Sequence, residues 1–158
     1  MPDKILTTKA LTAVLDARRA RGERIVFTNG CFDLLHVGHT RYLQEAKKLG
    51  DCLVVGLNSD ASVRAIKPQG RPLVPQSHRA EVLAALACVD YVVTFDDPDP
   101  RNLIAAVRPD VLVKGGDWPI DQIVGREIVQ ASGGQVVTIP LVPGVSTTSL
   151  VRRIKSLP

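Results

Sequence analysis

Two histidines, His36 and His39, stand three residues apart at the predicted start of a helix, with Gly38 between them. Residues with this spacing project to the same side of a helix entrance, so both imidazoles can donate hydrogen bonds to one phosphate beside the free N–H groups of the first turn. Gly38 would let that phosphate approach the backbone. Either histidine alone would be interpreted as a helix cap or a packing residue. The pair, with its glycine directly after a strand and loop, predicts a phosphate site.

A short segment, Asn29-Gly30-Cys31-Phe32-Asp33, precedes the histidines and follows a predicted strand. A glycine just after a strand permits a turn that places the backbone beneath a phosphate, so we expect this segment to line an anion site. Cys31 is not expected to be a nucleophile, because displacement at phosphorus needs no covalent intermediate. Asp33 is expected to order the loop rather than to act as a base, since a phosphomonoester oxygen is already ionised at neutral pH.

Two further polar clusters follow predicted strands. One contains Lys114, Gly116 and Asp117, in which the lysine is a cation at the mouth of a strand and the glycine belongs to a flexible turn. The other is the hydroxyl-rich run Ser146-Thr147-Thr148-Ser149 at the predicted entrance of the last helix. Its hydroxyl and N–H groups suit a phosphate, although a plain helix N-cap would have the same composition.

A basic segment broken by proline and glycine, residues 67–72, is predicted to be a mobile surface loop. Lys67 and Arg71 lie in this loop and Arg79 follows it. We expect the three to close over the β- and γ-phosphates of a nucleotide and to neutralise departing pyrophosphate. The alternative is that Lys67 and Arg71 are ordinary solvated charges. His78 is expected to be a helix-surface residue.

The elements that must position these residues alternate between strand and helix. Short apolar runs predict strands at residues 25–27, 53–55, 91–93, 111–113 and 136–139. Helical spacing predicts helices at residues 8–21, 38–49, 61–66, 76–87, 103–107, 120–131 and 148–157. This alternation indicates an α/β fold, a single Rossmann-like, doubly wound, five-stranded parallel sheet with helices on both faces.

Ligands bind such a sheet at the carboxyl ends of its strands. The polar clusters at residues 28–39, 113–118 and 144–150 follow the first, fourth and fifth predicted strands, so we expect them to meet in one site. The 158 residues are expected to form one domain, with a leading helix at residues 1–22 and an α/β core that carries the candidate site at residues 24–157.

Composition limits the other classes of function. With 45% apolar residues the chain can bury a core, and no apolar run suits a membrane span or a signal peptide, so we expect a cytoplasmic protein with no membrane partner. Three cysteines without C-x-x-C spacing predict neither disulfides nor a zinc site, and no metal site built by the chain is expected. The net charge of +4 suits an anion, but dispersed basic residues and 4% aromatics argue against a nucleic-acid partner.

The motifs G-x-F-D at residues 30–33, H-x-G-H at residues 36–39 and V-S-T-T at residues 145–148 resemble those of the cytidylyltransferase-like superfamily. Stretches outside these motifs, among them L-N-S-D-A-S-V, G-R-P-L-V-P and P-D-V-L-V-K-G-G-D, are most similar to the adenylyltransferases of bacterial ADP-heptose synthesis. The resemblance implies transfer of AMP from ATP to D-glycero-β-D-manno-heptose 1-phosphate, giving ADP-heptose and pyrophosphate, with Mg²⁺ accompanying ATP.

The resemblance also implies roles for particular residues and partners. His36 and His39 would contact the ATP phosphates, residues 29–33 would line the nucleotide pocket, and Lys114 with residues 146–149 would hold the phosphates or the nucleotide. The substrates would be small molecules, the enzyme a homo-oligomer, and a separate heptose kinase would supply the sugar 1-phosphate. Because the heptose activity often comes fused to a sugar kinase, we expect either a stand-alone enzyme or an excised domain.

One difference between this sequence and a similar family concerns which nucleotide is bound. The similar glycerol 3-phosphate cytidylyltransferases have Arg and Thr where this chain has Leu141 and Val142, which disfavours CTP. Three alternatives stay open at this point. They are a cytidylyltransferase or FAD synthetase of the same superfamily, a non-catalytic nucleotide-binding module, and another doubly wound binding domain of the flavodoxin type.

Overall fold

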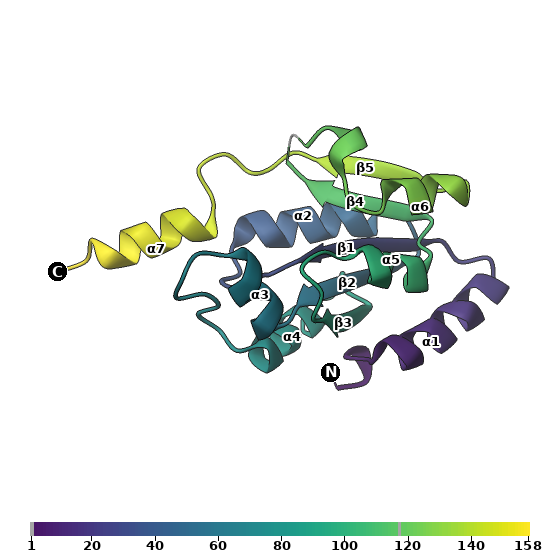
Figure 1. Ribbon diagram of the computed structural model, residues 1–158, viewed down its shortest axis with the longest axis horizontal. Coiled ribbons are helices and arrows are strands. Elements are labelled where there is room, and N and C mark those ends of the chain that lie inside the picture. Colours follow the sequence, from purple (N-terminus) through teal and green to yellow (C-terminus); the bar gives the residue numbers. More distant parts are fainter. Residues whose placement is uncertain (1, 117) are drawn as a thin grey trace.

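Five parallel strands form the centre of the structure, a computed structural model that describes residues 2–116 and 118–158. The strands are β1 (Ile25–Gly30), β2 (Cys52–Asn58), β3 (Tyr91–Phe95), β4 (Val111–Gly115) and β5 (Gln135–Ile139). They pair in the order β3-β2-β1-β4-β5, so the chain moves outward from β1 first in one direction and then in the other (Figure 1). This order confirms the predicted doubly wound sheet and creates a switch point between β1 and β4.

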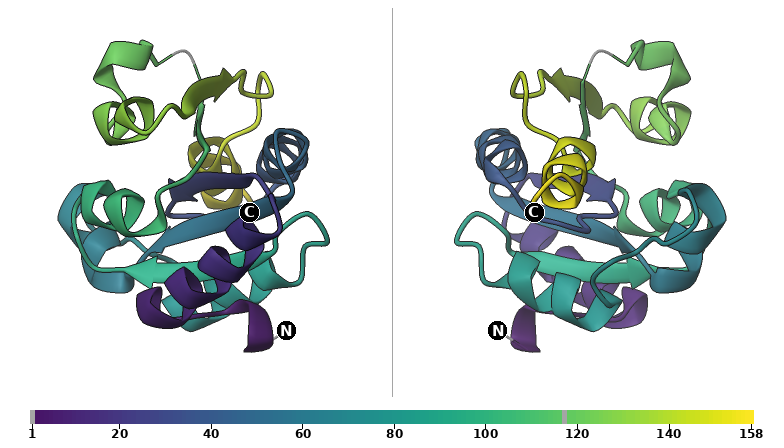
Figure 2. Two further views of the ribbon diagram at one scale, coloured as in Figure 1. Left: turned by 90° about the vertical axis from the view of Figure 1, so that its right-hand side faces the viewer. Right: turned by 90° about the vertical axis from the view of Figure 1, so that its left-hand side faces the viewer.

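Helices cover both faces of the sheet, and each face has its own buried apolar cluster. On one face lie α1 (Thr8–Ala20), α5 (Arg101–Val107) and α6 (Arg126–Ala131), and on the other α2 (Val37–Lys47) and α4 (Gln76–Ala84). Figure 2 shows α2 and α6 on opposite sides of the sheet. Leu15 and Ile104 belong to the first cluster, and Leu43 and Leu83 to the second. The strands are apolar runs rather than alternating patterns because both faces are buried.

One predicted helix is wrong. Residues 120–131 do not form a continuous helix; they form a short 3₁₀ turn, η2 (Ile120–Gln122), and the separate helix α6. The break lies at Gly125, whose φ of 86° is left-handed and whose added Cβ would stand 2.6 Å from Ile104 Cδ1. Only glycine fits both conditions, so the chain turns there before α6 begins.

Aspartates hold the amino ends of the strands. Asp110 accepts the N–H of Ile25 at 2.7 Å, and Asp90 accepts the N–H of Leu53 at the same distance. Asp51 likewise accepts the N–H of Arg24, at 2.7 Å. These charge-assisted hydrogen bonds satisfy backbone N–H groups at the amino ends of the strands, where strand pairing begins.

The opposite, carboxyl edge of the sheet carries the elements that build the site. The first turn of α2, the short helix α3 (Asp60–Ile66), the loop of residues 67–75 and the last helix α7 (Thr147–Lys155) all lie there (Figure 1). α7 extends away from the sheet, and the remaining short element, η1 (Pro2–Lys4), lies far from this edge.

Candidate active site

A cleft of about 740 Å³ opens at the carboxyl edge, between the end of β1, α3, the basic loop and α7. The structure brings most of the sequence-predicted site residues to its wall, namely Asn29, Gly30, Cys31, Phe32, Asp33, His39, Lys67, Arg71, Lys114, Thr147 and Thr148. They come from four segments that are far apart in the sequence, which is the convergence expected of a parallel sheet.

Other predicted site residues are not among those that line the cleft. They are His36, Gly38, Arg79, Gly116, Ser146 and Ser149. The prediction for Asp117 falls outside the described residues.

The histidine pair begins helix α2 by a reciprocal cap. His36 is the N-cap, and its Nδ1 accepts the N–H of Gly38 at 3.1 Å. In return, Nδ1 of His39 accepts the N–H of His36 at 3.4 Å. The two rings stack with their centroids 3.9 Å apart and their planes at 25°. The capping and the phosphate-binding interpretations are therefore compatible, because capping uses only one nitrogen of each ring.

The cap also decides which ring nitrogen carries hydrogen. Burial lowers the pKa of His36, and burial together with the neighbouring His36 lowers the pKa of His39 to about 4, so both rings are neutral at pH 7. A neutral imidazole whose Nδ1 accepts a hydrogen bond carries its proton on Nε2. Among the described residues neither Nε2 has a hydrogen-bond partner. Each ring thus offers one N–H donor to a ligand.

At two positions only glycine fits, because a neighbouring aromatic ring occupies the space that a Cβ would need. A Cβ on Gly38 would stand 2.9 Å from Cε1 and Nδ1 of His36, so the capping imidazole occupies the space that we expected a phosphate to approach. A Cβ on Gly30 would stand 2.9 Å from the ring of Phe32. Phe32 itself has the left-handed φ of 46° and its ring lies 5.3 Å from that of His39. Phe32 therefore helps to fix the second imidazole.

Asp33 orders the basic loop, as expected from the sequence. Its buried carboxylate accepts the N–H groups of Leu73 and Val74 at 2.9 Å and pairs with Nη1 of Arg71 at 3.1 Å. Burial alone would raise the pKa of Asp33, but the two amides and the guanidinium outweigh it and hold that pKa below its ordinary value. The loop is thus pinned against the β1 segment by an ionised carboxylate.

The prediction that Arg79 contacts phosphates requires correction. Its side chain is only 1% exposed, because α4 turns it inward rather than into the cleft. The guanidinium donates to the carbonyl oxygens of Cys31, Asn58 and Val74 at 2.6, 2.8 and 2.9 Å, and to the carboxylate of Asp60 at 2.7 Å. Arg79 therefore joins the ends of β1 and β2 to the loop and supports the site from behind.

Two lysines supply positive charge to the cleft wall beside Cys31. Burial lowers the pKa of Lys114, and nearby Lys67 lowers it further while Cys31 acts in the opposite direction. Burial raises the pKa of the Cys31 thiol despite the two cations Lys67 and Arg79. A protonated, half-buried thiol is a poor nucleophile, which agrees with the expectation that the chemistry does not pass through Cys31.

The entrance of α7 faces the same cleft. Ser146 and Ser149 form a second reciprocal cap, with the N–H of Ser149 bonded to Oγ of Ser146 at 3.0 Å. Their hydroxyls are thereby used in starting the helix, which is the plain N-cap that the sequence left open. Thr147 and Thr148 line the cleft, and Thr147 Oγ1 donates to the carbonyl oxygen of Leu34 at 3.3 Å.

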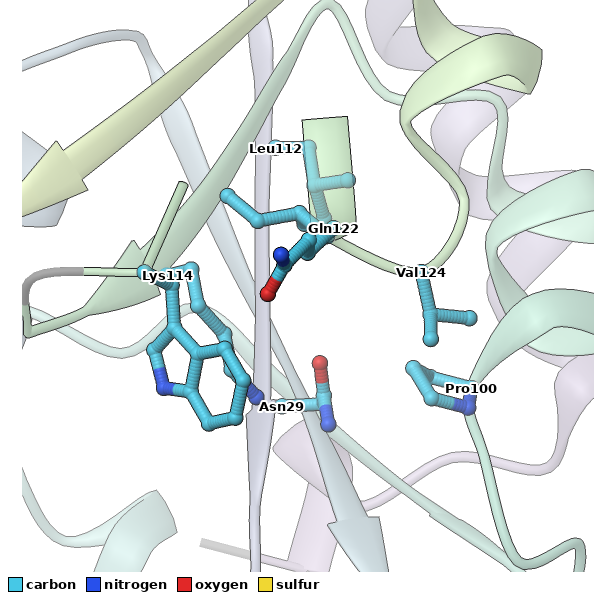
Figure 3. A pocket seen from close by; sticks show the side chains of 8 residues that line it. Asn29, Pro100, Leu112, Lys114, Gln122 and Val124 are labelled. Atoms are coloured by element: carbon cyan, nitrogen blue, oxygen red, sulfur yellow. The ribbon is translucent and has the colours of Figure 1, made fainter. Parts of the chain in front are cut away.

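A smaller pocket of about 140 Å³ adjoins the cleft at the switch point between β1 and β4. The two hollows share Asn29, Pro100, Lys114 and Val124. Figure 3 shows the side-chain amides of Asn29 and Gln122 directed into this pocket. Trp118, whose role the sequence did not reveal, also lines it and is 54% exposed.

Polar residues at the end of β2 and after β3 also line the cleft, and they were not predicted from the sequence. Asn58 ends β2 and lines the cleft, and its amide donates to Oγ of Ser62 at 2.9 Å. Ser62 in turn donates to the carbonyl oxygen of Asp97, which ties α3 to the segment after β3. Asp99 in that segment also lines the cleft. Both strands are followed by polar residues, so the rule that found the other clusters would have found these as well.

The doubly wound sheet and the cleft at its carboxyl edge are typical of the class of α/β proteins that bind nucleotides. The profile of the cytidylyltransferase-like family matches residues 27–153, and the chain belongs to that family. The chain is accordingly an enzyme of the nucleotidyltransferase class, as the motifs predicted. Among the described residues, no helix is both long and apolar enough to cross a membrane, and no group of three or more histidine, cysteine or carboxylate residues is placed to hold a metal ion.

Curated relatives named bifunctional protein HldE match almost the whole chain. The protein of Geobacter sulfurreducens is 54% identical over 151 residues, which are 96% of this chain and 31% of the relative. That of Pseudomonas fluorescens is 50% identical over 152 residues, which are 96% of this chain and 32% of the relative. The chain thus spans about a third of the length of these relatives.

Solved structures agree with the fold. A lipopolysaccharide core biosynthesis protein from Thermoplasma volcanium is 30% identical, with a TM-score of 0.61 over 77% of this chain and 98% of that one. The pantoate-beta-alanine ligase of Francisella tularensis is 13% identical, with a TM-score of 0.60 over 96% of this chain and 76% of that one. At that identity the second likeness concerns the fold alone.

Proposed function

We propose that this chain is an adenylyltransferase that transfers AMP from ATP to D-glycero-β-D-manno-heptose 1-phosphate. The observation that carries the proposal is the capped histidine pair, in which His39 lines a cleft that also contains Lys67 and Lys114, and in which neither neutral imidazole has a partner for its Nε2–H among the described residues. Similarity to the HldE proteins supports the heptose acceptor, and similarity to a lipopolysaccharide core biosynthesis protein supports the same pathway. Leu141 and Val142, in place of Arg and Thr, favour ATP over CTP.

The reaction needs no protein nucleophile. An oxygen of the sugar 1-phosphate attacks the α-phosphorus of MgATP, a new P–O bond forms, and the bond to the bridging oxygen of the β-phosphate breaks to release pyrophosphate. The metal ion enters with the nucleotide and neutralises part of the phosphate charge. The cleft and the smaller pocket meet at Asn29 and Lys114, so a ligand in one would lie beside a ligand in the other.

The residues of the chain position the phosphates and stabilise charge. Nε2–H of His39, which lines the cleft, and Nε2–H of His36 donate to the α- and β-phosphates, where negative charge develops during transfer. Lys114 and Lys67 stabilise the triphosphate electrostatically, and the N–H groups at the start of α7 add a helix N-terminus. Arg71 closes the loop side of the cleft through Asp33.

The proposal extends to the setting of the reaction. A kinase reaction must supply the sugar 1-phosphate, and we propose that a separate heptose kinase does so when the chain acts alone. We also propose a cytoplasmic location, where ATP is available, and a homo-oligomeric enzyme. Size-exclusion chromatography with light scattering measures the last of these directly.

A pyrophosphate-release assay tests the activity. The four nucleoside triphosphates are crossed with heptose 1-phosphate, glycerol 3-phosphate and FMN. We expect release with ATP and heptose 1-phosphate, at a rate that falls roughly 10²-fold or more in His39→Ala. His78→Ala, which removes an exposed histidine on α4, is the matched control. Pyrophosphate release only with CTP and glycerol 3-phosphate would indicate a cytidylyltransferase instead, and release only with ATP and FMN would indicate an FAD synthetase. ATP binding without pyrophosphate release would indicate a non-catalytic nucleotide-binding module.

A further inference from the structure

The last helix lines the cleft well beyond its entrance. In addition to Thr147 and Thr148, the cleft wall includes Val151 and Lys155 of α7. These positions are separated by three or four residues, so they share one face of the helix. α7 is nine residues long, and this face therefore forms a wall of the cleft along nearly its whole length.

Lys155 differs from the other cations of the same helix turn. The last turn of α7 contains Arg152, Arg153 and Lys155, all exposed, and only Lys155 lines the cleft. Figure 1 shows α7 pointing outward from the carboxyl edge, and Figure 2 shows it in front of that edge. Because a helical side chain inclines toward the helix N-terminus, the ammonium group of Lys155 is directed back toward the cleft.

The cleft has few cations that are free to meet an anion. Arg71 is paired with a buried carboxylate, and the guanidinium of Arg79 is buried among carbonyl oxygens. The two imidazoles are neutral at pH 7 and donate hydrogen bonds without adding charge. Lys67, Lys114 and Lys155 are the remaining basic residues of the described cleft wall. A triphosphate and a sugar phosphate bring several negative charges into this space, so each lysine matters for their binding.

We propose that Lys155 is a phosphate-binding residue of this site, which contacts the outermost phosphate of the triphosphate and then the released pyrophosphate. The inference rests on the proposed function and adds a residue that the shared motifs do not contain. Lys155 lies eight residues after Thr147, about 12 Å further along the helix axis. We assign the entrance of α7 and Lys155 to opposite ends of the triphosphate, with Lys67 on the loop side.

The test compares Lys155→Ala with Arg153→Ala, which removes an equally exposed charge from the same turn outside the cleft. We expect Lys155→Ala to raise the KM for ATP about five- to twentyfold, with kcat changed less than about threefold, because a ground-state contact is lost. The inhibition constant of pyrophosphate should rise by a similar factor. Lys155→Arg should restore most of both values, and Arg153→Ala should leave both within about twofold.

Direct binding separates this inference from the proposed activity. Calorimetry with a non-hydrolysable ATP analogue and with pyrophosphate should show the same loss of affinity in Lys155→Ala, and a smaller difference at high salt. If the wild-type chain binds both ligands but releases no pyrophosphate with any acceptor, the proposed function fails and the binding comparison still decides the role of Lys155. Equal affinities in Lys155→Ala and wild type, or equal losses in Lys155→Ala and Arg153→Ala, would overturn it.

Discussion

The substitution Gly38→Ala separates the stability of helix α2 from the chemistry of its first turn. An added Cβ would stand 2.9 Å from Cε1 and Nδ1 of His36, closer than real Cβ contacts, so the imidazole must move. The hydrogen bond from the Gly38 N–H to Nδ1 is then weakened, and the His36 ring shifts relative to the His39 ring on which it stacks. The backbone at Gly38 is helical, so alanine meets no conformational barrier of its own.

The two effects on stability have opposite signs. Loss of the cap costs about 0.5–2 kcal/mol, whereas alanine in place of glycine in a helix gains up to about 1 kcal/mol. We therefore expect the free energy of unfolding to change by less than about 1 kcal/mol. Turnover should respond far more, because one positioned donor at a developing charge is worth about 10²–10³-fold in rate. A loss of about 10²-fold corresponds to about 2.7 kcal/mol of transition-state stabilisation.

The assay measures pyrophosphate release from ATP and heptose 1-phosphate alongside urea unfolding of the same protein sample. Val37→Ala is the control, since Val37 precedes Gly38 in the same turn and is 45% exposed. We expect Val37→Ala to match wild type in both measurements. A Gly38→Ala enzyme with turnover within about threefold of wild type would refute the reasoning, because it would mean that the orientation of His36 is unimportant.

Three other perturbations test the supports of the site. Asp33→Asn weakens the anchor of residues 71–74, so the amides of Leu73 and Val74 should exchange hydrogen at least about tenfold faster, as mass spectrometry or NMR can measure. Arg79→Met leaves buried carbonyl groups and a carboxylate without their donor, and the free energy of unfolding by urea should fall by about 3–5 kcal/mol. Folding lowers the pKa of His39 from 6.5 to about 4, so between these pH values the unfolded chain binds a proton that the folded chain does not. The free energy of unfolding that is present above pH 6.5 should therefore fall as the pH is lowered toward 4. His39→Asn should make urea midpoints less sensitive to pH in that window.

The sheet was predictable because each strand is a short apolar run followed by polar residues. β2 is buried along its whole length, and its sequence accordingly lacks the alternation of a half-exposed strand. The break between η2 and α6 was not predictable from spacing alone. It depends on the left-handed backbone of Gly125 and on the crowding of Ile104 against it, which are tertiary facts.

The placement of residues at the cleft was predictable where residue type and position act together, as for His39 and Lys114. Arg79 was predicted wrongly because a basic side chain suggested a phosphate contact, whereas its position around helix α4 places it on the buried face. It lies one turn before the buried Leu83, and that spacing already placed it on the inward face. Lys155 carries no motif, and only the path of α7 along the cleft reveals it.

The aspartate hydrogen bonds and the proposed substrate cleft lie at opposite edges of one sheet. Asp51, Asp90 and Asp110 fasten the amino border, where no residue of the described cleft wall lies. A laboratory evolution experiment toward another acceptor can therefore begin by strengthening the amino border, since stabilising changes there leave substrate contacts untouched. Destabilising changes near the cleft, which new specificities usually require, then become tolerable in the same protein.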